Sequence, residues 1–256
     1  MSEVVAKSTD SGLEADQSQV RSLIIYPVVL LAILGALLIW LANAGLTATE
    51  QVTLNPSDLW AMTLEHLYLT VIATVIVLVV AIPLGILLTR PPLRRLSAPV
   101  MALANVGQAA PAVGLIVLLA FWLGFGTTAA IMALVVYAIL PVLRNTMAGL
   151  DAVDSSLVEA GRGMGMSAAA VLWRVELPLA VPLMLAGVRT ALVLVVGTAA
   201  LATFINGGGL GLLITTGIQL DLPRVLITGS VLVALLALAV DWLGRLVEHV
   251  ARPRGL

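Results

Sequence analysis

The sequence predicts an all-α integral membrane protein with about six transmembrane helices and with both termini in the cytoplasm. Three observations lead to this prediction. Of the 256 residues, 61% are hydrophobic and only 11% are charged, whereas soluble domains carry about 25% charged residues. Six stretches are apolar enough to cross the membrane as helices, which takes about 20 residues for about 30 Å of hydrocarbon. Arginines gather in alternate loops between these stretches.

The first element in chain order is a polar segment. Residues 1–21 contain no basic region followed by a short apolar core and a small-residue cleavage site. We interpret them as a disordered cytoplasmic tail and not as a signal peptide. The apolar stretch behind them is expected to stay in the membrane as a first span.

The six predicted spans follow one another along the chain. Only the sequence FWLGFGTT separates the third from the fourth, where two glycines allow a short turn and three aromatic residues suit the membrane interface. The predicted spans are residues 23–42, 67–89, 98–120, 127–143, 185–205 and 225–243.

Basic residues predict how the spans are oriented, because short cytoplasmic loops carry the excess of lysine and arginine. The loops at 43–63, 121–127 and 206–224 hold only Arg224 between them. The segments predicted to be cytoplasmic hold Lys7, Arg21, Arg90, Arg94, Arg95, Arg144, Arg162, Arg174, Arg245, Arg252 and Arg254.

Residues 159–178, EAGRGMGMSAAAVLWRVELP, are expected in one of these cytoplasmic loops. Ser156 and Glu159 have the spacing of a capping box, and Asp154 is an alternative cap, so a short helix is predicted to start here. Three glycines are predicted to break that helix: Gly161, Gly163 and Gly165.

A second short helix is predicted to begin after Ser167 and to end at Pro178. Its apolar residues share one side of the helix, which is also typical of an ordinary loop helix that rests on lipid headgroups. These residues are Ala168, Val171, Leu172 and Val175.

The spacing of this segment resembles the EAA loop of the permease subunits of ABC importers, whose pattern is E-A-A, three residues, G, nine residues, I-x-L-P. The chain departs from it at Gly161, where the pattern has a second alanine, and at Val175, where it has isoleucine. The resemblance implies an element that couples the membrane helices to a separate ATP-binding subunit. Its residues are Glu159, Ala160, Gly161, Gly165, Val175, Leu177 and Pro178.

A wider resemblance, over roughly residues 64–222, is to the osmoprotectant branch of these permeases, which imports glycine betaine, choline and carnitine. It implies the type I, MetI-like permease fold and a bacterial or archaeal cytoplasmic (inner) membrane. It also implies two ATPase subunits that bind ATP and Mg, a second permease chain, identical or paralogous, and an extracytoplasmic substrate-binding protein. The stretches that carry it are 65–90, 140–154, 159–167, 175–191 and 204–214.

The resemblance divides the chain into four parts. Residues 1–21 are the tail, and 22–63 hold the first span and an outer loop. Residues 64–246 are the permease core with the coupling loop at 148–178, and 247–256 are a second cytoplasmic tail.

Four polar residues are candidates to line the translocation path: Asn105 and Gln108 before Pro111, and Thr203 and Asn206 before a glycine run. Hydrogen bonds between helices are an equally good explanation for them. The glycines are candidates for an outer gate or for docking of the binding protein, and they match neither glycine-rich phosphate motif. They are Gly207, Gly208, Gly209 and Gly211.

Composition also bears on the chemistry of the chain. It has no cysteine, and its only lysine follows an alanine in the tail, so a P-loop is excluded. We expect no catalytic residue, no metal or other cofactor in this chain, and no nucleic-acid partner; membrane lipid surrounds it. Carriage of another small solute, such as an amino acid, remains an alternative.

An ion-coupled secondary carrier is an alternative of a different class, and it would typically keep acidic or histidine residues inside the bundle. His66, His249, Glu65 and Asp241 are instead predicted near span ends. Arg189 lies about a turn inside the fifth span, where it is expected to reach the surface or the coupling loop. This distribution favours a passive path that a partner drives.

Overall fold

The computed structural model describes residue 23 and residues 25–251, with side chains up to residue 248. The chain divides into two compact units, and the division falls between Gly45 and Leu46. Within the first unit, the described residues form a helix, Ile25–Asn43, which is long and apolar enough to be the predicted first span. The predicted tail 1–21, and with it Lys7 and Arg21, lies outside the described residues, as do Arg252, Arg254 and the side chain of His249.

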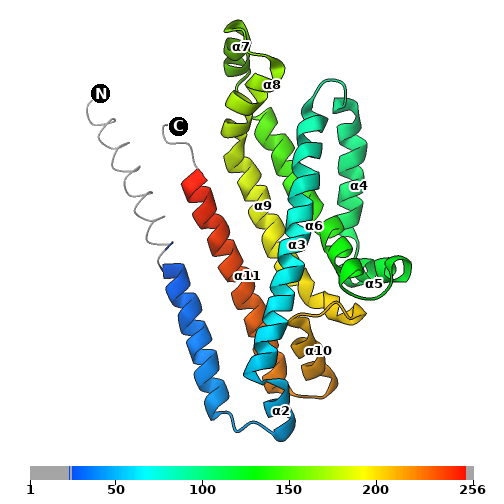
Figure 1. The fold of residues 1–256 in the computed structure, drawn as a ribbon, viewed down its shortest axis with the longest axis vertical. Helices are drawn as coiled ribbons and strands as arrows, with labels where there is room; N and C mark the ends of the chain where they lie inside the picture. Colours follow the sequence, from blue (N-terminus) through cyan, green and yellow to red (C-terminus); the bar gives the residue numbers. More distant parts are fainter. Residues whose placement is uncertain (1–22, 24, 252–256) are drawn as a thin grey trace, which may run out of the picture. The chain divides into compact units, whose positions relative to one another are not determined.

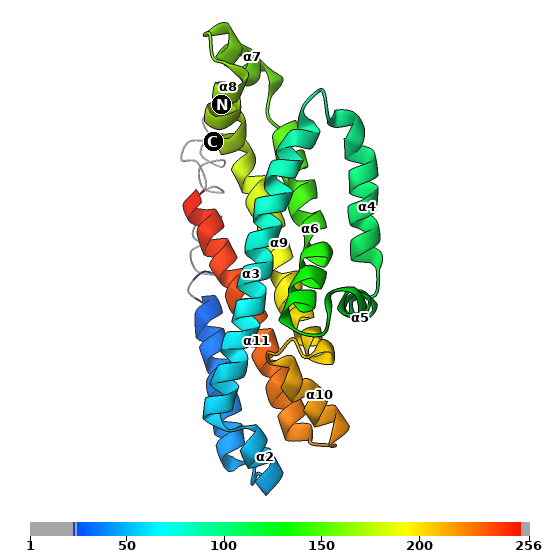
Figure 2. The same ribbon diagram turned by 45° about the vertical axis from the view of Figure 1, so that its right-hand side comes forward.

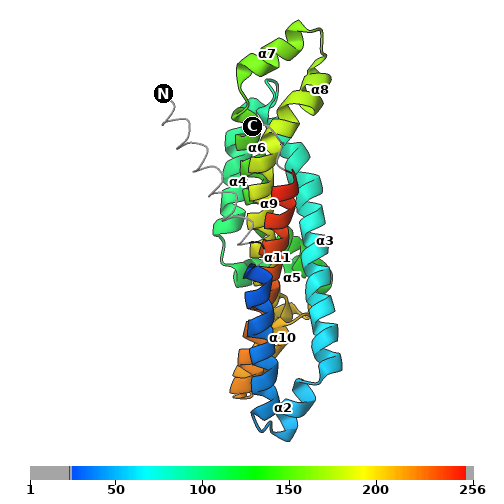
Figure 3. The same ribbon diagram turned by 90° about the vertical axis from the view of Figure 1, so that its left-hand side faces the viewer.

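Every regular element of the second unit is helical in the part of the chain that is described, as predicted. Two ends can be distinguished in all views: α7 and α8 lie at one end of this unit, and α2 and α10 lie at the other (Figure 1, Figure 2 and Figure 3). The elements are α2 (Ala48–Thr53), α3 (Pro56–Thr89), η1 (Arg94–Leu96), α4 (Ser97–Ala109), α5 (Ala112–Leu123), α6 (Thr127–Asp151), α7 (Ser155–Gly163), α8 (Ala168–Val171), η2 (Leu172–Glu176), α9 (Leu177–Ala199), η3 (Ala200–Ile205), α10 (Gly211–Gln219) and α11 (Pro223–Ala251).

Five helical stretches of the described residues are long and apolar enough to cross a membrane. The predicted third span differs, because α4 and α5 meet at an angle of 102° and are not one straight helix. The bend falls at Ala110 and Pro111, where Ala110 takes an extended conformation with ψ 142°. A proline disfavours the helical conformation of the residue before it and donates no hydrogen bond, which explains the break.

The core of the second unit forms where α6 packs between α3 and α9. Small side chains dominate this core, and Ala73, Ala133 and Ala191 are each at most 1% exposed. Lipid tails are as apolar as leucine, so helices in a bilayer associate through close packing that small residues permit. His66 adds a polar contact between α3 and α9, because its Nε2 lies 2.9 Å from the carbonyl oxygen of Val196.

Ion pairs connect α11 to its neighbours near both of its ends. Arg189 of α9 contacts Asp241 at 2.7 Å and Glu248 at 3.4 Å. The carboxylates of α11, rather than the coupling loop, therefore hold the charge of Arg189. Near the start of α11, Arg224 donates to the buried carboxylate of Glu50 in α2 at 3.0 Å.

Candidate functional site

The coupling segment, which we define as residues 154–178, begins with a side-chain cap. Of the two caps that the sequence allows, the structure has Asp154, whose Oδ1 accepts a hydrogen bond from the Ser156 N–H at 2.8 Å. This backbone hydrogen bond lowers the pKa of Asp154, because it stabilises the charged carboxylate. Helix α7 therefore begins at Ser155, one residue before the capping box would place its cap.

The first helix ends later than the sequence predicts. Helix α7 includes Gly161 and Gly163, so the prediction that these two glycines break it is wrong. The break is at Gly165, whose φ of +82° is in the left-handed region. The N–H groups of Gly165 and Met166 donate back to the carbonyls of Arg162, at 2.9 Å, and Gly161, at 3.2 Å, which is the Schellman pattern of a helix end.

The second helix starts as predicted and then continues into the membrane. Ser167 caps α8 by accepting from the Ala170 N–H at 3.2 Å. The prediction that Pro178 ends this helix is wrong, because Ala168–Ile205 is one continuous span candidate. A π-helical turn at Leu172–Glu176 precedes Pro178, which lies in the first turn of α9. The coupling segment is thus joined to α9 without a flexible linker.

The buried contact between the two short helices is formed around Gly161. A Cβ atom at this position would meet Val171 Cγ2 at 3.4 Å and Met166 Sδ at 3.6 Å, which is ordinary van der Waals contact. Alanine, which the EAA pattern has at this position, therefore fits here without displacing a neighbour.

We predict that Gly161→Ala raises the melting temperature of the purified protein by about 1–4 °C, because alanine favours helix by up to about 1 kcal/mol over glycine. Thermal unfolding in detergent measures this. Gly163→Ala is the control. It makes the same exchange in the same helix, but its Cβ would contact nothing within 4 Å, so it shows the effect of alanine without the contact to α8. A lower melting temperature for Gly161→Ala would show that α7 and α8 pack differently.

The coupling segment carries several exposed apolar side chains. Trp173 is 70% exposed, and Leu157 and Met164 are also exposed. Glu159, Ala160 and Pro178 are exposed as well, whereas Val175 and Leu177 are half-buried where the segment joins α9. Of the predicted apolar stripe, Val171 is buried and Ala168 is exposed. Exposed apolar surface beside charged residues is typical of a protein-binding surface.

An ion pair that sequence reasoning missed holds the base of this segment. Arg90, the residue after α3, donates to both carboxylate oxygens of Glu176, which ends the π-helical turn. The Glu176 side chain is 8% exposed and the Arg90 side chain 30% exposed. The only signal in the sequence was a carboxylate within an apolar run, on the same predicted side of the membrane as Arg90.

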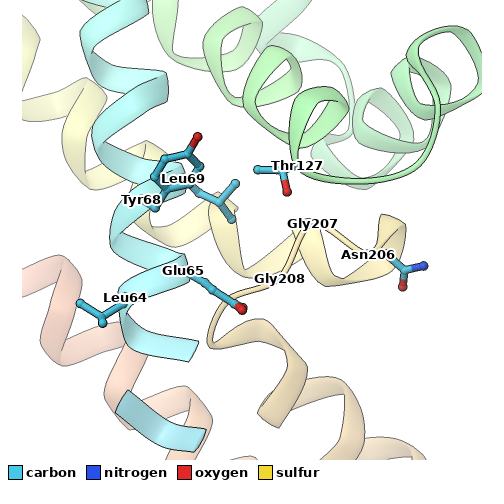
Figure 4. Close-up of a pocket in the computed structure, with 8 residues that line it drawn as sticks. All are labelled: Leu64, Glu65, Tyr68, Leu69, Thr127, Asn206, Gly207 and Gly208. Carbon is cyan, nitrogen blue, oxygen red and sulfur yellow. The ribbon is translucent and has the colours of Figure 1, made fainter. Parts of the chain in front are cut away.

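A cavity of about 400 Å³ lies toward the opposite end of the second unit, between α3, the start of α6 and residues 207–209, which we call the glycine run. Figure 4 shows the Glu65 side chain pointing from α3 toward this run. Its Oε2 accepts a hydrogen bond from the Gly209 N–H at 2.9 Å. The cavity is lined by Leu64, Glu65, Tyr68, Leu69, Thr127, Asn206, Gly207 and Gly208.

The four candidate path residues do not come together in one place. Asn206 lines the cavity, and Thr203 contacts Thr215 of α10 at 3.5 Å through their hydroxyl groups. On α4, Asn105 accepts from Arg144 at 3.4 Å, and Gln108 is half-buried in the same helix. Among the candidate gate glycines, Gly207 and Gly208 line the cavity, Gly209 binds Glu65, and Gly211 begins α10.

Comparison with known proteins identifies a family. Residues 81–252 match the family of binding-protein-dependent transport system inner membrane components. The glycine betaine/carnitine/choline transport system permease protein OpuCB of Bacillus subtilis is 40% identical over 202 residues, which are 79% of this chain and 92% of that protein. The osmoprotectant import permease protein OsmY of Salmonella typhimurium is 41% identical over 224 residues, which are 86% and 92% of the two chains.

Solved structures share the fold. The MetNI methionine ABC transporter, in an inward-facing conformation, has a chain with a TM-score of 0.67 and 26% identity to this one. That match covers 77% of this chain and 97% of the other. A chain of an amino acid ABC transporter has a TM-score of 0.65 at 19% identity, over 80% of this chain and 98% of the other. It shares the same fold.

Proposed function

We propose, because this chain belongs to the family of binding-protein-dependent transport system inner membrane components, that it carries an osmoprotectant such as glycine betaine or choline as the permease subunit of an ATP-driven importer. Relatives that are named for glycine betaine, carnitine and choline transport support this substrate class. The chain is a multi-pass membrane protein, and we place it in the cytoplasmic (inner) membrane of a bacterium or archaeon.

One observation carries the coupling mechanism: the exposed Trp173 lies in a helical stretch that continues without a break into the membrane helix α9. A partner that binds at Trp173 and moves the coupling segment therefore also moves α9. The partner in this proposal is an ATPase subunit, in two copies, that binds ATP and Mg, and the closure of this pair supplies the force. The Arg90–Glu176 pair passes the same motion to the end of α3.

The rest of the proposed transport cycle follows from the cytoplasmic position of the coupling segment. The coupling segment and both termini lie in the cytoplasm, and residues 206–211 lie on the outer side, where a substrate-binding protein docks. The solute crosses between two permease chains, identical or paralogous, and Asn105, Gln108, Thr203 and Asn206 contribute to its path. Residues 64–246 form the permease core, and 22–63 add the first span and an outer loop.

A pull-down from native membranes tests the coupling proposal. We expect a tagged wild-type chain to retain an ATPase subunit and Trp173→Ala to lose most of it. A tryptophan that becomes buried at the centre of an interface typically contributes about 2 kcal/mol or more to the free energy of binding. Trp60→Ala is the matched control, since Trp60 is 64% exposed and lies near the start of α3, at the opposite end. Retention of the ATPase by all three proteins would place its docking surface elsewhere.

Uptake assays test the substrate and the energy source. Labelled glycine betaine, choline and methionine distinguish an osmoprotectant from an amino acid importer, which the likeness to a methionine transporter makes the second candidate. We expect uptake of the two quaternary amines to stop when the partner ATPase is inactivated by mutation. Uptake that persists without the ATPase and follows an ion gradient would instead identify a secondary carrier.

A further inference from the structure

Glu65 lines the cavity, and its carboxylate forms no ion pair with a described residue. The ion pairs found among the described side chains do not include Glu65, and no lysine or arginine lines the cavity. The carboxylate is also fixed in place: Oε2 accepts from the Gly209 N–H, and a Cβ on Gly208 would lie only 2.7 Å from it. Glu65 is an exposed residue whose side chain points toward the glycine run, and a negative charge in this position attracts a cation and repels an anion.

The rest of the cavity suits a cation that carries alkyl groups. Tyr68 follows Glu65 by three residues, so both side chains share one face of α3, and both line the cavity. Leu64 adds exposed apolar surface, Leu69 lines the cavity as a buried side chain, and Thr127 faces them from the start of α6 (Figure 4). An alkylated ammonium has few or no N–H donors, so it is recognised by a carboxylate charge, an aromatic ring and apolar walls. The volume of about 400 Å³ fits a small ligand.

We propose that this cavity binds the alkylated ammonium group of the solute, with Glu65 as its counter-charge and Tyr68 as its aromatic wall. The inference rests on the proposed function, because it places the solute beside the glycine run where the binding protein docks. The cavity then receives the solute as it leaves that protein and holds it weakly before it crosses.

Direct binding of labelled choline to the purified permease–ATPase complex, without the binding protein, tests the site. We expect binding in the millimolar range and a five- to tenfold higher Kd for Glu65→Gln, which is about 1–1.4 kcal/mol. Glutamine keeps an oxygen to accept from Gly209, so the loop stays in place and only the charge is lost. Asp58→Asn, which removes an exposed carboxylate two turns earlier on α3, is expected to leave Kd unchanged.

A second pair of variants examines the ring. Tyr68→Phe keeps the aromatic face and is expected to bind choline as the wild type does, whereas Tyr68→Leu is expected to weaken binding about threefold or more. Equal Kd values for Glu65→Gln and the wild type, or for Tyr68→Leu and Tyr68→Phe, would overturn the assignment. So would the absence of choline binding to the wild-type complex.

The same complex in two kinds of nanodisc distinguishes a free solute from a lipid headgroup. Choline is expected to bind equally well in phosphatidylglycerol and in phosphatidylcholine; loss of binding in phosphatidylcholine alone would assign the cavity to lipid. Uptake in cells separates this inference from the proposed function. Normal choline transport with an unchanged Kd in Glu65→Gln overturns only the cavity site, whereas a wild type that transports no quaternary amine overturns the proposed substrate.

Discussion

Replacing Arg90 with methionine is expected to lower the melting temperature of the protein by about 4–12 °C. Methionine keeps much of the apolar stem, but Glu176 then has no charged partner in a site where it is 8% exposed. Breaking a buried ion pair costs about 3–5 kcal/mol. Because Arg90 is 30% exposed, we expect about 2–3 kcal/mol, and each kcal/mol shifts the melting temperature of a chain of this size by about 2–4 °C.

The same substitution is expected to reduce ATP-driven uptake more than ATP hydrolysis. The ion pair joins the end of α3 to the start of α9, so without it the motion of the coupling segment reaches the end of α3 only through apolar packing. Uptake per ATP hydrolysed, measured in proteoliposomes with the binding protein, is the quantity to compare. We expect it to fall at least severalfold.

Arg94→Met is the matched control for Arg90→Met. Arg94 pairs with Asp151 at 3.6 Å at the same end of the bundle, but these side chains are 67% and 48% exposed. Exposed pairs contribute about 0–1 kcal/mol, so this variant should melt within about 4 °C of the wild type. Equal losses in the two variants would mean that general charge at this end, and not the buried pair, stabilises the fold.

The membrane spans were predictable because span formation depends on length and apolar content, which are local sums over the sequence. The bend in the third span was not. Pro83, Pro141 and Pro182 lie inside α3, α6 and α9 without ending them, whereas Pro111 separates two helices. Whether a proline breaks a membrane helix depends on whether neighbouring groups satisfy the backbone that it frees, and those neighbours come from distant parts of the chain.

The coupling segment shows the same division between local and distant causes. Asp154 and Ser167 act as caps through hydrogen bonds to residues two and three positions away, so the sequence predicts Ser167 directly and gives Asp154 as one of two candidates. Gly161 was wrongly predicted to break its helix because its burial against Val171 depends on how α7 and α8 pack. Pro178 was wrongly predicted to end a helix because a π-helical turn places it at the start of the next one.

Contacts between distant residues account for the rest of what the sequence did not predict. Arg90 and Glu176 are 86 residues apart, and Glu65 and Gly209 are 144 residues apart. From the sequence, Glu65 is interpreted only by its position near a span end and Arg90 only as a residue of a cytoplasmic loop, and Glu176 has no role. The pairings required the arrangement of α3 beside α9 and of the glycine run beside α3, which no local pattern contains.

Gly211→Ala is expected to be among the most destabilising single substitutions in the described part of the chain. A Cβ at Gly211 would lie 1.8 Å from the carbonyl oxygen and 2.6 Å from the carbonyl carbon of Ala200, where α10 packs on η3. These are backbone atoms, so no side chain can rotate away and the two elements must separate. Overpacking typically costs 1–3 kcal/mol, and we expect about 3 kcal/mol here, or a melting temperature lowered by about 6–12 °C.

Gly197→Ala provides the control for this substitution, because it introduces the same methyl group in α9, where a Cβ would meet nothing within 4 Å. It should leave the melting temperature unchanged or raise it slightly, since alanine favours helix. The cavity provides a second measurement. Gly211 follows the run that lines it, so separation of α10 from η3 should also weaken choline binding, whereas Gly197→Ala should not. Similar melting temperatures for the two variants would show that α10 can shift at little cost, and that the glycine at 211 is not required for close packing.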